Sequence, residues 1–208
     1  MPVLALTMLA LVLQPFFDVP GQGSPRVVVY VFAFIPLIGL VLLGRRPGIV
    51  VAVTVASVGA FVLGLMESTS TEALLIGWIG LLNISLYLGV IALLGRIVFQ
   101  SSSLVDDRVY GGVAVYLLLA IVFSFIHHRI GITTADAYLN TVDRTGPPLN
   151  WSDYLYFSFT AFTTAGFGDI VPTNPFAKAA TSIESVIGVL FPAVLIARLI
   201  NRDFKPRA

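Results

Sequence analysis

Long stretches without a charged side chain dominate this sequence and limit most strongly how it can fold. Five such runs contain no Asp, Glu, Lys or Arg, and they cover residues 1–17, 27–44, 47–66, 73–95 and 109–126. A sixth apolar run, at about 175–197, holds only Lys178 at its start and Glu184 within it. The hydrocarbon core of a bilayer is about 30 Å thick and needs about 20 helical residues. The runs therefore predict six transmembrane helices.

The composition agrees with this prediction. The 208 residues are 57% hydrophobic, and only 11% are charged, against about 25% in soluble proteins. So few charges exclude an ordinary soluble enzyme and a disordered tail. The net charge of +1 gives no basic surface for nucleic acid. Because the chain has no cysteine, disulfides, thiolate metal sites and a cysteine nucleophile are excluded too. We expect an integral membrane protein.

The first run is the shortest, and it includes Gln14 and Pro15. A signal peptide is the alternative interpretation of residues 1–17. However, no basic segment precedes the run, and no small-x-small cleavage site stands before the turn at 20–23. We therefore expect a first span that is retained.

Basic residues predict the orientation, because cytoplasmic loops carry an excess of Lys and Arg. With six spans and a cytoplasmic amino terminus, the inner side carries Arg45, Arg46, Arg96, Arg108, Arg198, Arg202, Lys205 and Arg207, and the outer side carries Arg26, Arg129, Arg144 and Lys178. This bias places both termini on the cytoplasmic side of an inner or plasma membrane. Most acidic residues then fall outside, where they either concentrate cations or are scattered loop charges.

A shorter apolar stretch lies between the last two runs. The loop sequence Gly146-Pro147-Pro148 is followed by Trp151-Ser152-Asp153 and then by the aromatic run 154–162. A stretch of this length is too short to cross a bilayer and is typical of a re-entrant segment. Ser152 or Asp153 is a suitable N-cap for a helix there. We predict a re-entrant helix.

The residues after this helix have a pattern that suits cation binding. Residues 163–169 read Thr-Thr-Ala-Gly-Phe-Gly-Asp, so Gly166 and Gly168 alternate with other residues. Glycine adopts backbone conformations that other residues avoid, which allows successive carbonyl oxygens to face one axis. Such oxygens can replace the water shell of a dehydrated monovalent cation. One chain supplies one such strand and four would close a ring, so we expect a homotetramer.

This segment resembles the potassium channel family, whose filter signature reads Thr-Val-Gly-Tyr-Gly-Asp. The match runs from Thr164 to Asp169. The aromatic residues and double threonine of 156–164 resemble the family's pore helix. The last apolar run resembles the inner helix of prokaryotic six-span members. The specific resemblance covers about residues 109–200, whereas the first 100 residues match only in the number of spans.

The resemblance implies roles for individual residues. Ion sites would be formed by the hydroxyl group of Thr164 and by the backbone carbonyls of Thr164, Ala165, Gly166 and Phe167. Thr163 precedes these sites, Phe162 supports them, and Gly168 and Asp169 shape the outer mouth. The permeant K⁺ ions would be the only cofactor, with no organic group.

Two residues depart from the family signature. Phe167 replaces a tyrosine and lacks the hydroxyl that bonds to the pore helix, although Gly-Phe-Gly filters occur in the family. Ala165 replaces a larger β-branched residue, so the packing behind the filter is looser. We predict potassium selectivity, with a filter more prone to collapse or sodium leak.

The fold class expected is an all-α membrane protein with six spans and a re-entrant pore helix, assembled as a tetramer. Residues 1–100 would form a four-helix domain and residues 101–208 the pore domain. The run 73–95 stands where a voltage sensor would carry arginines, and only Arg96 follows it. Steep gating needs about three or four charges per subunit. We therefore expect weak voltage dependence.

Several residues of the pore region have two interpretations. Gly188 and Pro192 loosen a helix and predict a gating hinge, with close helix packing at Gly188 as the alternative. Glu184 is either a proton sensor or a buried anchor bonded to the pore helix or filter, and we favour the anchor. His127 and His128 are interpreted as a polar helix end rather than an external pH sensor.

The leading hypothesis is a channel that conducts K⁺ passively and is not an enzyme. A nonselective monovalent cation channel of the same architecture is the alternative. A potassium transporter fits less well, because such chains carry four pore loops. A membrane enzyme would need more intramembrane catalytic groups than Glu184 alone. The lipid bilayer is the expected surrounding, and the gating stimulus and any separate regulatory subunit are left open.

Overall fold

A computed structural model of the chain describes residues 2–17, 73–99, 105–142 and 148–203. The predicted spans at 27–44 and 47–66 lie outside these described residues.

Helices form nearly all of the regular structure that is described. They are α1 (Pro2–Phe17), α4 (Ala73–Phe99), α5 (Val105–Thr133), α6 (Trp151–Phe162) and α7 (Pro175–Asp203). Four of them coincide with the apolar runs near 1–17, 73–95, 109–126 and 175–197, and α6 coincides with the predicted re-entrant helix. The helical prediction is confirmed for these segments.

Two of the described helices contain segments long and apolar enough to cross a membrane. These segments are Arg108–Thr133 in α5 and Pro175–Ile200 in α7. Shorter apolar segments, Val3–Leu13 and Asn83–Arg96, lie in α1 and α4. The two long helices agree with a membrane protein, while the number of six spans stays a prediction.

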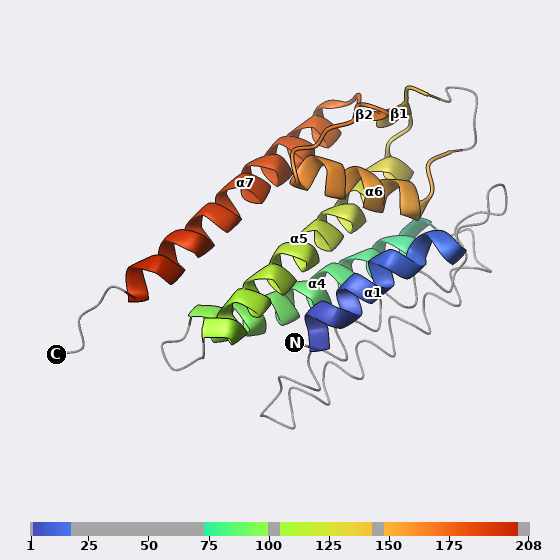
Figure 1. The fold of residues 1–208 in the computed structure, drawn as a ribbon. Helices are drawn as coiled ribbons and strands as arrows, with labels where there is room; N and C mark the ends of the chain where they lie inside the picture. Colours follow the sequence, from blue (N-terminus) through green and yellow to red (C-terminus); the bar gives the residue numbers. More distant parts are fainter. Residues whose placement is uncertain (1, 18–72, 100–104, 143–147, 204–208) are drawn as a thin grey trace.

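Helix α5 occupies the centre of the arrangement (Figure 1). Helices α1 and α4 pack on one side of it, and α6 and α7 pack on the other. The main hydrophobic core lies along α5, where Leu118 and Ile121 are fully buried against Tyr87 and Val90 of α4 and Leu155 of α6. In contrast, α7 keeps a long apolar face exposed, which includes Ile183, Val186, Val189, Leu190 and Val194.

A small antiparallel sheet joins the two loops that flank α6. Strand β1 (Tyr138–Asn140) pairs with β2 (Ile170–Pro172), and Leu139 lies opposite Val171. The expectation of an all-α fold missed this sheet, because three residues are too few to produce a recognisable alternation of apolar and polar side chains. The pairing connects the loop before α6 to the segment after the glycine pair.

Candidate functional site

Helix α6, which the sequence predicts to be re-entrant, has a well-formed amino-terminal cap. The side chain of Asn150 accepts a hydrogen bond from the backbone N–H of Asp153 (3.1 Å), and the Asp153 carboxylate accepts one from the N–H of Asn150 (2.7 Å). This reciprocal pair is a capping box. The prediction that Ser152 or Asp153 is the N-cap was therefore wrong. Asn150 precedes the first helical residue, whereas Ser152 and Asp153 already lie inside the helix.

The capping box leads to a stability prediction. Replacing Asn150 by alanine removes the acceptor for a helix-terminal N–H and should lower the free energy of unfolding by about 1 kcal/mol. Replacing it by serine should recover most of that loss, because serine is also a good N-cap. Thermal unfolding followed by circular dichroism in detergent compares the two variants. Equal melting temperatures for wild type and N150A would contradict this role.

The length of α6 agrees with a segment that enters the membrane and does not cross it. Its 12 residues correspond to about 18 Å of helix, well below the thickness of about 30 Å of the hydrocarbon core. At its end, Thr164 N–H donates to the carbonyl of Ala161 and Gly166 N–H donates to the carbonyl of Thr160, both at 3.1 Å. The last turn of α6 thereby holds the start of the following segment.

In the backbone after α6, every second residue from Thr164 to Gly168 adopts a left-handed conformation. Thr164, Gly166 and Gly168 have positive φ angles of 59°, 51° and 81°, whereas the described residues between them do not have positive φ. Alternating left- and right-handed residues is the condition under which successive carbonyls can face one side of an extended strand. Thr164 is β-branched, and a left-handed conformation costs such a residue about 1–2 kcal/mol. Strain of this kind is typical of functional segments.

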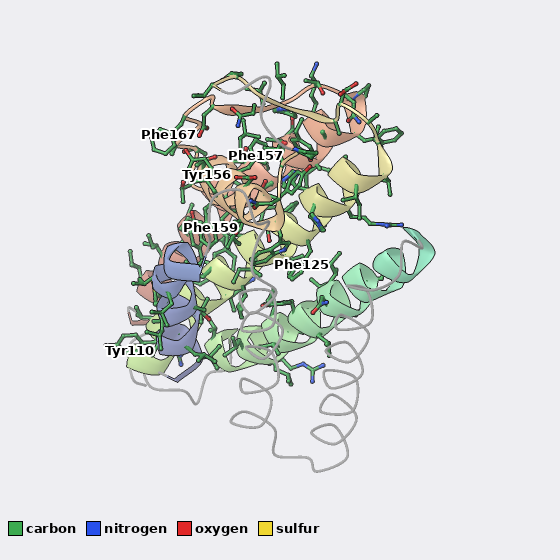
Figure 2. The ribbon with its side chains drawn as sticks, turned by 90° about the vertical axis from the view of Figure 1, so that its right-hand side faces the viewer. Tyr110, Phe125, Tyr156, Phe157, Phe159 and Phe167 are labelled. Atoms are coloured by element: carbon green, nitrogen blue, oxygen red, sulfur yellow. The ribbon has the colours of Figure 1, made fainter. Side chains whose placement is uncertain are left out.

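This segment lies at the surface of the single chain. Residues 163–168 are all exposed, and the Phe167 ring is 72% exposed. The Phe167 ring stacks on Tyr156 of α6, with the ring centroids 6.3 Å apart and the planes 5° from parallel. Both residues lie at the same edge of the molecule (Figure 2). Stacking thus joins the segment after α6 to α6 itself, at the position where the resembled family has a tyrosine.

The loop before α6 holds the carboxyl-terminal end of the segment. The hydroxyl of Thr141 donates to the carbonyl of Gly168 (2.8 Å), and the N–H of Thr141 donates to the carbonyl of Asp169 (2.7 Å). Sequence reasoning missed Thr141, because it stands in a polar loop with nothing to mark it. Its contact depends on the pairing of β1 with β2.

Glu184 lies at the centre of a buried polar network. Its side chain is fully buried, with Oε2 2.7 Å from Nε2 of His127 and Oε1 2.5 Å from Oγ of Ser158 on α6. The other ring nitrogen of His127, Nδ1, lies 2.6 Å from the hydroxyl of Tyr138. These contacts support the interpretation of Glu184 as an anchor of the pore helix.

His127 was interpreted as a polar end of the fifth span, and this is wrong. Helix α5 continues to Thr133, so His127 lies inside the helix and is fully buried. Its ring also packs edge-on against Phe157 of α6, with the centroids 5.0 Å apart. His128 points differently and contacts the Tyr154 ring. A pair of adjacent histidines does not reveal which one turns inward, because that depends on how α5 packs.

Gly188 touches the end of α6. A Cβ atom at this position would lie 1.9 Å from the carbonyl oxygen of Phe162 and 2.8 Å from its carbonyl carbon. Ser185, on the same face of α7, donates to the carbonyl of Ala161 (3.2 Å). Close packing at Gly188, the alternative to a hinge, thus has direct support. Helix α7 runs unbroken through Pro192, and the gating hinge stays a prediction.

Comparison with known proteins gives two matches. Residues 113–203 match the family profile described as "Ion channel". The chain is also similar to "Two-pore potassium channel 4" of Arabidopsis thaliana, with 31% identity over 85 residues. That alignment covers 41% of this chain and 30% of the plant protein, so the chain spans less than a third of the relative's length. No solved structure gives a significant match.

The ion-channel match covers most of α5 and all of the segment that has just been described. It includes α6, the alternating residues 164–168 and α7. This part of the chain is therefore similar to ion-channel proteins, among them a plant potassium channel.

Proposed function

We propose that this chain is one subunit of a homotetrameric, potassium-selective channel that conducts K⁺ passively across a membrane. The observation that carries the proposal is the alternation of left-handed residues at Thr164, Gly166 and Gly168. It follows directly on a capped helix of half-membrane length, and both lie within the ion-channel match. Neither feature is needed for a helix pair that only crosses a membrane.

The chemistry of the site would come from backbone oxygen. The carbonyls of residues 164–167 and the Thr164 hydroxyl would replace the hydration shell of K⁺. A single chain can surround an ion on one side only, so four copies are needed to complete each site. The exposed filter segment and the exposed apolar face of α7 support the idea that other copies, and lipid, cover them. Residues 101–208 would form the pore domain and residues 1–100 a separate helical domain.

Recording from the purified chain in planar bilayers tests the proposal. With K⁺ on one side of the bilayer and Na⁺ on the other, the reversal potential of the current should show a higher permeability for K⁺ than for Na⁺. Because Arg96 is the only charged residue in α4, and each charge moved through 100 mV contributes only about 2.3 kcal/mol, the conductance should change little along a voltage ramp. Absence of current would exclude a channel, and a steep conductance–voltage curve would exclude the weak voltage dependence.

Ala165 favours one alternative, a nonselective cation channel of the same architecture. Its small side chain leaves the filter less tightly packed than a β-branched residue would. A reversal potential near zero in mixed K⁺ and Na⁺ would support this alternative.

The two departures from the family signature give a further prediction. Replacing Ala165 by valine should shift the reversal potential toward the value expected for a K⁺-selective pore. It should also slow the decline of the current with time, because valine fills the space behind the filter. Replacing Phe167 by tyrosine should act in the same direction, because it restores a hydroxyl that can bond to the pore helix. Bi-ionic reversal potentials measure both effects. Unchanged selectivity and unchanged current stability in both variants would contradict this interpretation.

A further inference from the structure

The hydroxyl group of Ser158 lies within hydrogen-bond distance of two other oxygen atoms. Its Oγ is 2.6 Å from the backbone carbonyl oxygen of Ala120 on α5 and 2.5 Å from Oε1 of Glu184 on α7. The side chains of Ser158 and Glu184 are both fully buried. Each of these two short contacts therefore requires a hydrogen atom between the oxygens.

The number of hydrogen atoms available for these two contacts indicates whether the Glu184 carboxyl group is protonated. A serine hydroxyl carries one hydrogen, a carbonyl only accepts, and an ionised carboxylate only accepts. If Glu184 were ionised, Ser158 could donate to one oxygen, and the other pair would be two facing acceptors. If Glu184 is a carboxylic acid, its Oε1–H donates to Ser158 and Ser158 donates to the Ala120 carbonyl. Both contacts are then satisfied.

The other end of the network fits the same assignment. A neutral His127 donates from Nε2–H to Oε2 of Glu184 and accepts at Nδ1 from the hydroxyl of Tyr138. Burial raises the pKa of Tyr138 above its ordinary value of 10, so this hydroxyl keeps its proton at neutral pH. A charged His127 would instead donate from both nitrogens, and Ser158 would still lack a second hydrogen.

We propose that Glu184 is protonated at neutral pH and forms the middle of an uncharged chain of hydrogen bonds. The chain runs from the Tyr138 hydroxyl through His127, Glu184 and Ser158 to the carbonyl of Ala120. It joins β1, α5, α6 and α7, and every donor has one acceptor. An uncharged network also avoids the large penalty of burying an unpaired charge. Glu184 and His127 are thus positioning residues that hold the middle of the pore helix through neutral hydrogen bonds.

This assignment explains why a carboxyl group can stand deep within an apolar helix. The proposal concerns the protonation and packing of the folded chain and does not depend on ion conduction. The described titratable neighbours are Tyr154, whose ring contacts Tyr138, and His128, whose ring contacts Tyr154. Neither lies within hydrogen-bond distance of the Glu184 carboxyl among the described contacts.

Infrared spectroscopy of the purified full chain tests the protonation directly. The chain contains three glutamates, Glu67, Glu72 and Glu184, so labelling glutamate with ¹³C marks a small set of carboxyl groups. At pH 7 the labelled wild type should show the carbonyl stretch of a protonated carboxylic acid, and this band should be absent from E184Q. The exposed Asp136 is a control, because D136N should leave the labelled acid band unchanged. Loss of carboxylate bands in E184Q, with no acid band in wild type, would overturn the proposal.

A second measurement compares the melting temperatures of two variants, E184Q and E184A, because glutamine has nearly the same shape as a protonated glutamate. The amide of E184Q can donate to Ser158 and accept from His127, as a protonated Glu184 would, so its melting temperature should equal that of wild type. E184A leaves Ser158 and His127 without these partners and should melt several degrees lower. An E184Q chain that fails to fold, or that melts as low as E184A, would overturn the proposal. Neither measurement reads conduction, so the proposed channel function stands or falls separately.

Discussion

Replacing Gly188 by alanine should destabilise the chain far more than the same replacement at Gly89 or Gly95. The new Cβ atom would lie 1.9 Å from the carbonyl oxygen of Phe162, which is far inside the contact distance of the two atoms. Both the oxygen and the carbon behind it belong to the backbone, so no side-chain rotation relieves the overlap. Overpacking of a core costs about 1–3 kcal/mol and sometimes more. We expect a value at or above the upper end of this range.

Two other glycines provide matched controls for this prediction. A Cβ atom at Gly89 or Gly95 of α4 would meet nothing within 4 Å. Because glycine is about 0.5–1 kcal/mol less favourable than alanine inside a helix, G89A and G95A should be neutral or slightly stabilising. Thermal unfolding in detergent measures all three variants. A G188A chain that melts like wild type would contradict the packing role.

The same variant separates the two interpretations of Gly188. If the glycine serves close packing, G188A loses stability in the closed and the open channel alike. If it serves as a gating hinge, G188A keeps its melting temperature and changes the fraction of time that the channel is open. The structure supports the packing interpretation, because α7 crosses the end of α6 at this residue.

Replacing Gly166 by alanine should abolish potassium-selective current. Gly166 has a φ angle of 51°, and the left-handed conformation costs an alanine about 1–2 kcal/mol. A Cβ atom there would meet nothing within 4 Å of the single chain, so the conformational preference rather than a clash causes the effect. Returning this residue to negative φ would break the alternation of hand and turn one carbonyl away from its neighbours.

Planar-bilayer recording and thermal unfolding together test this prediction. G166A should keep a melting temperature within a few degrees of wild type, because the strained residue is exposed and lies outside the helices. Its potassium current should fall below detection, or its reversal potential should move toward zero. G89A, which makes the same chemical change at a helical residue, should conduct normally. A full K⁺-selective current from G166A would show that the alternation of hand at residues 164–168 does not form the ion sites.

Local chemistry explains which features could be predicted from the sequence. The apolar runs near 1–17, 73–95, 109–126 and 175–197 predict helices because their side chains need an apolar surrounding, and each is a helix in the structure. The short run 154–162 predicts a helix of half-membrane length. The glycines at 166 and 168 predict left-handed residues, and both have positive φ. Each of these signals lies within a few neighbouring residues.

Other features depend on contacts between distant segments. The cap at Asn150 was missed because three neighbouring polar residues were all acceptable caps and only the helix start distinguishes them. The strand β1 and the contact of Thr141 with Gly168 join residues 27 positions apart. No local pattern marks such a pair.

The contacts of His127 and Gly188 show most clearly which properties the sequence alone does not determine. By itself, the sequence determined that the chain is apolar and mostly helical, and that a short helix, a segment with alternating glycines and a long apolar helix follow one another near its end. These properties follow from side-chain polarity and from the conformational freedom of glycine. Only the tertiary structure decided that His127 turns inward to Glu184 and that Gly188 lies against Phe162. The physical reason is that the rotation of α5 and α7 about their axes is set by packing on α6, and that rotation determines which residues meet.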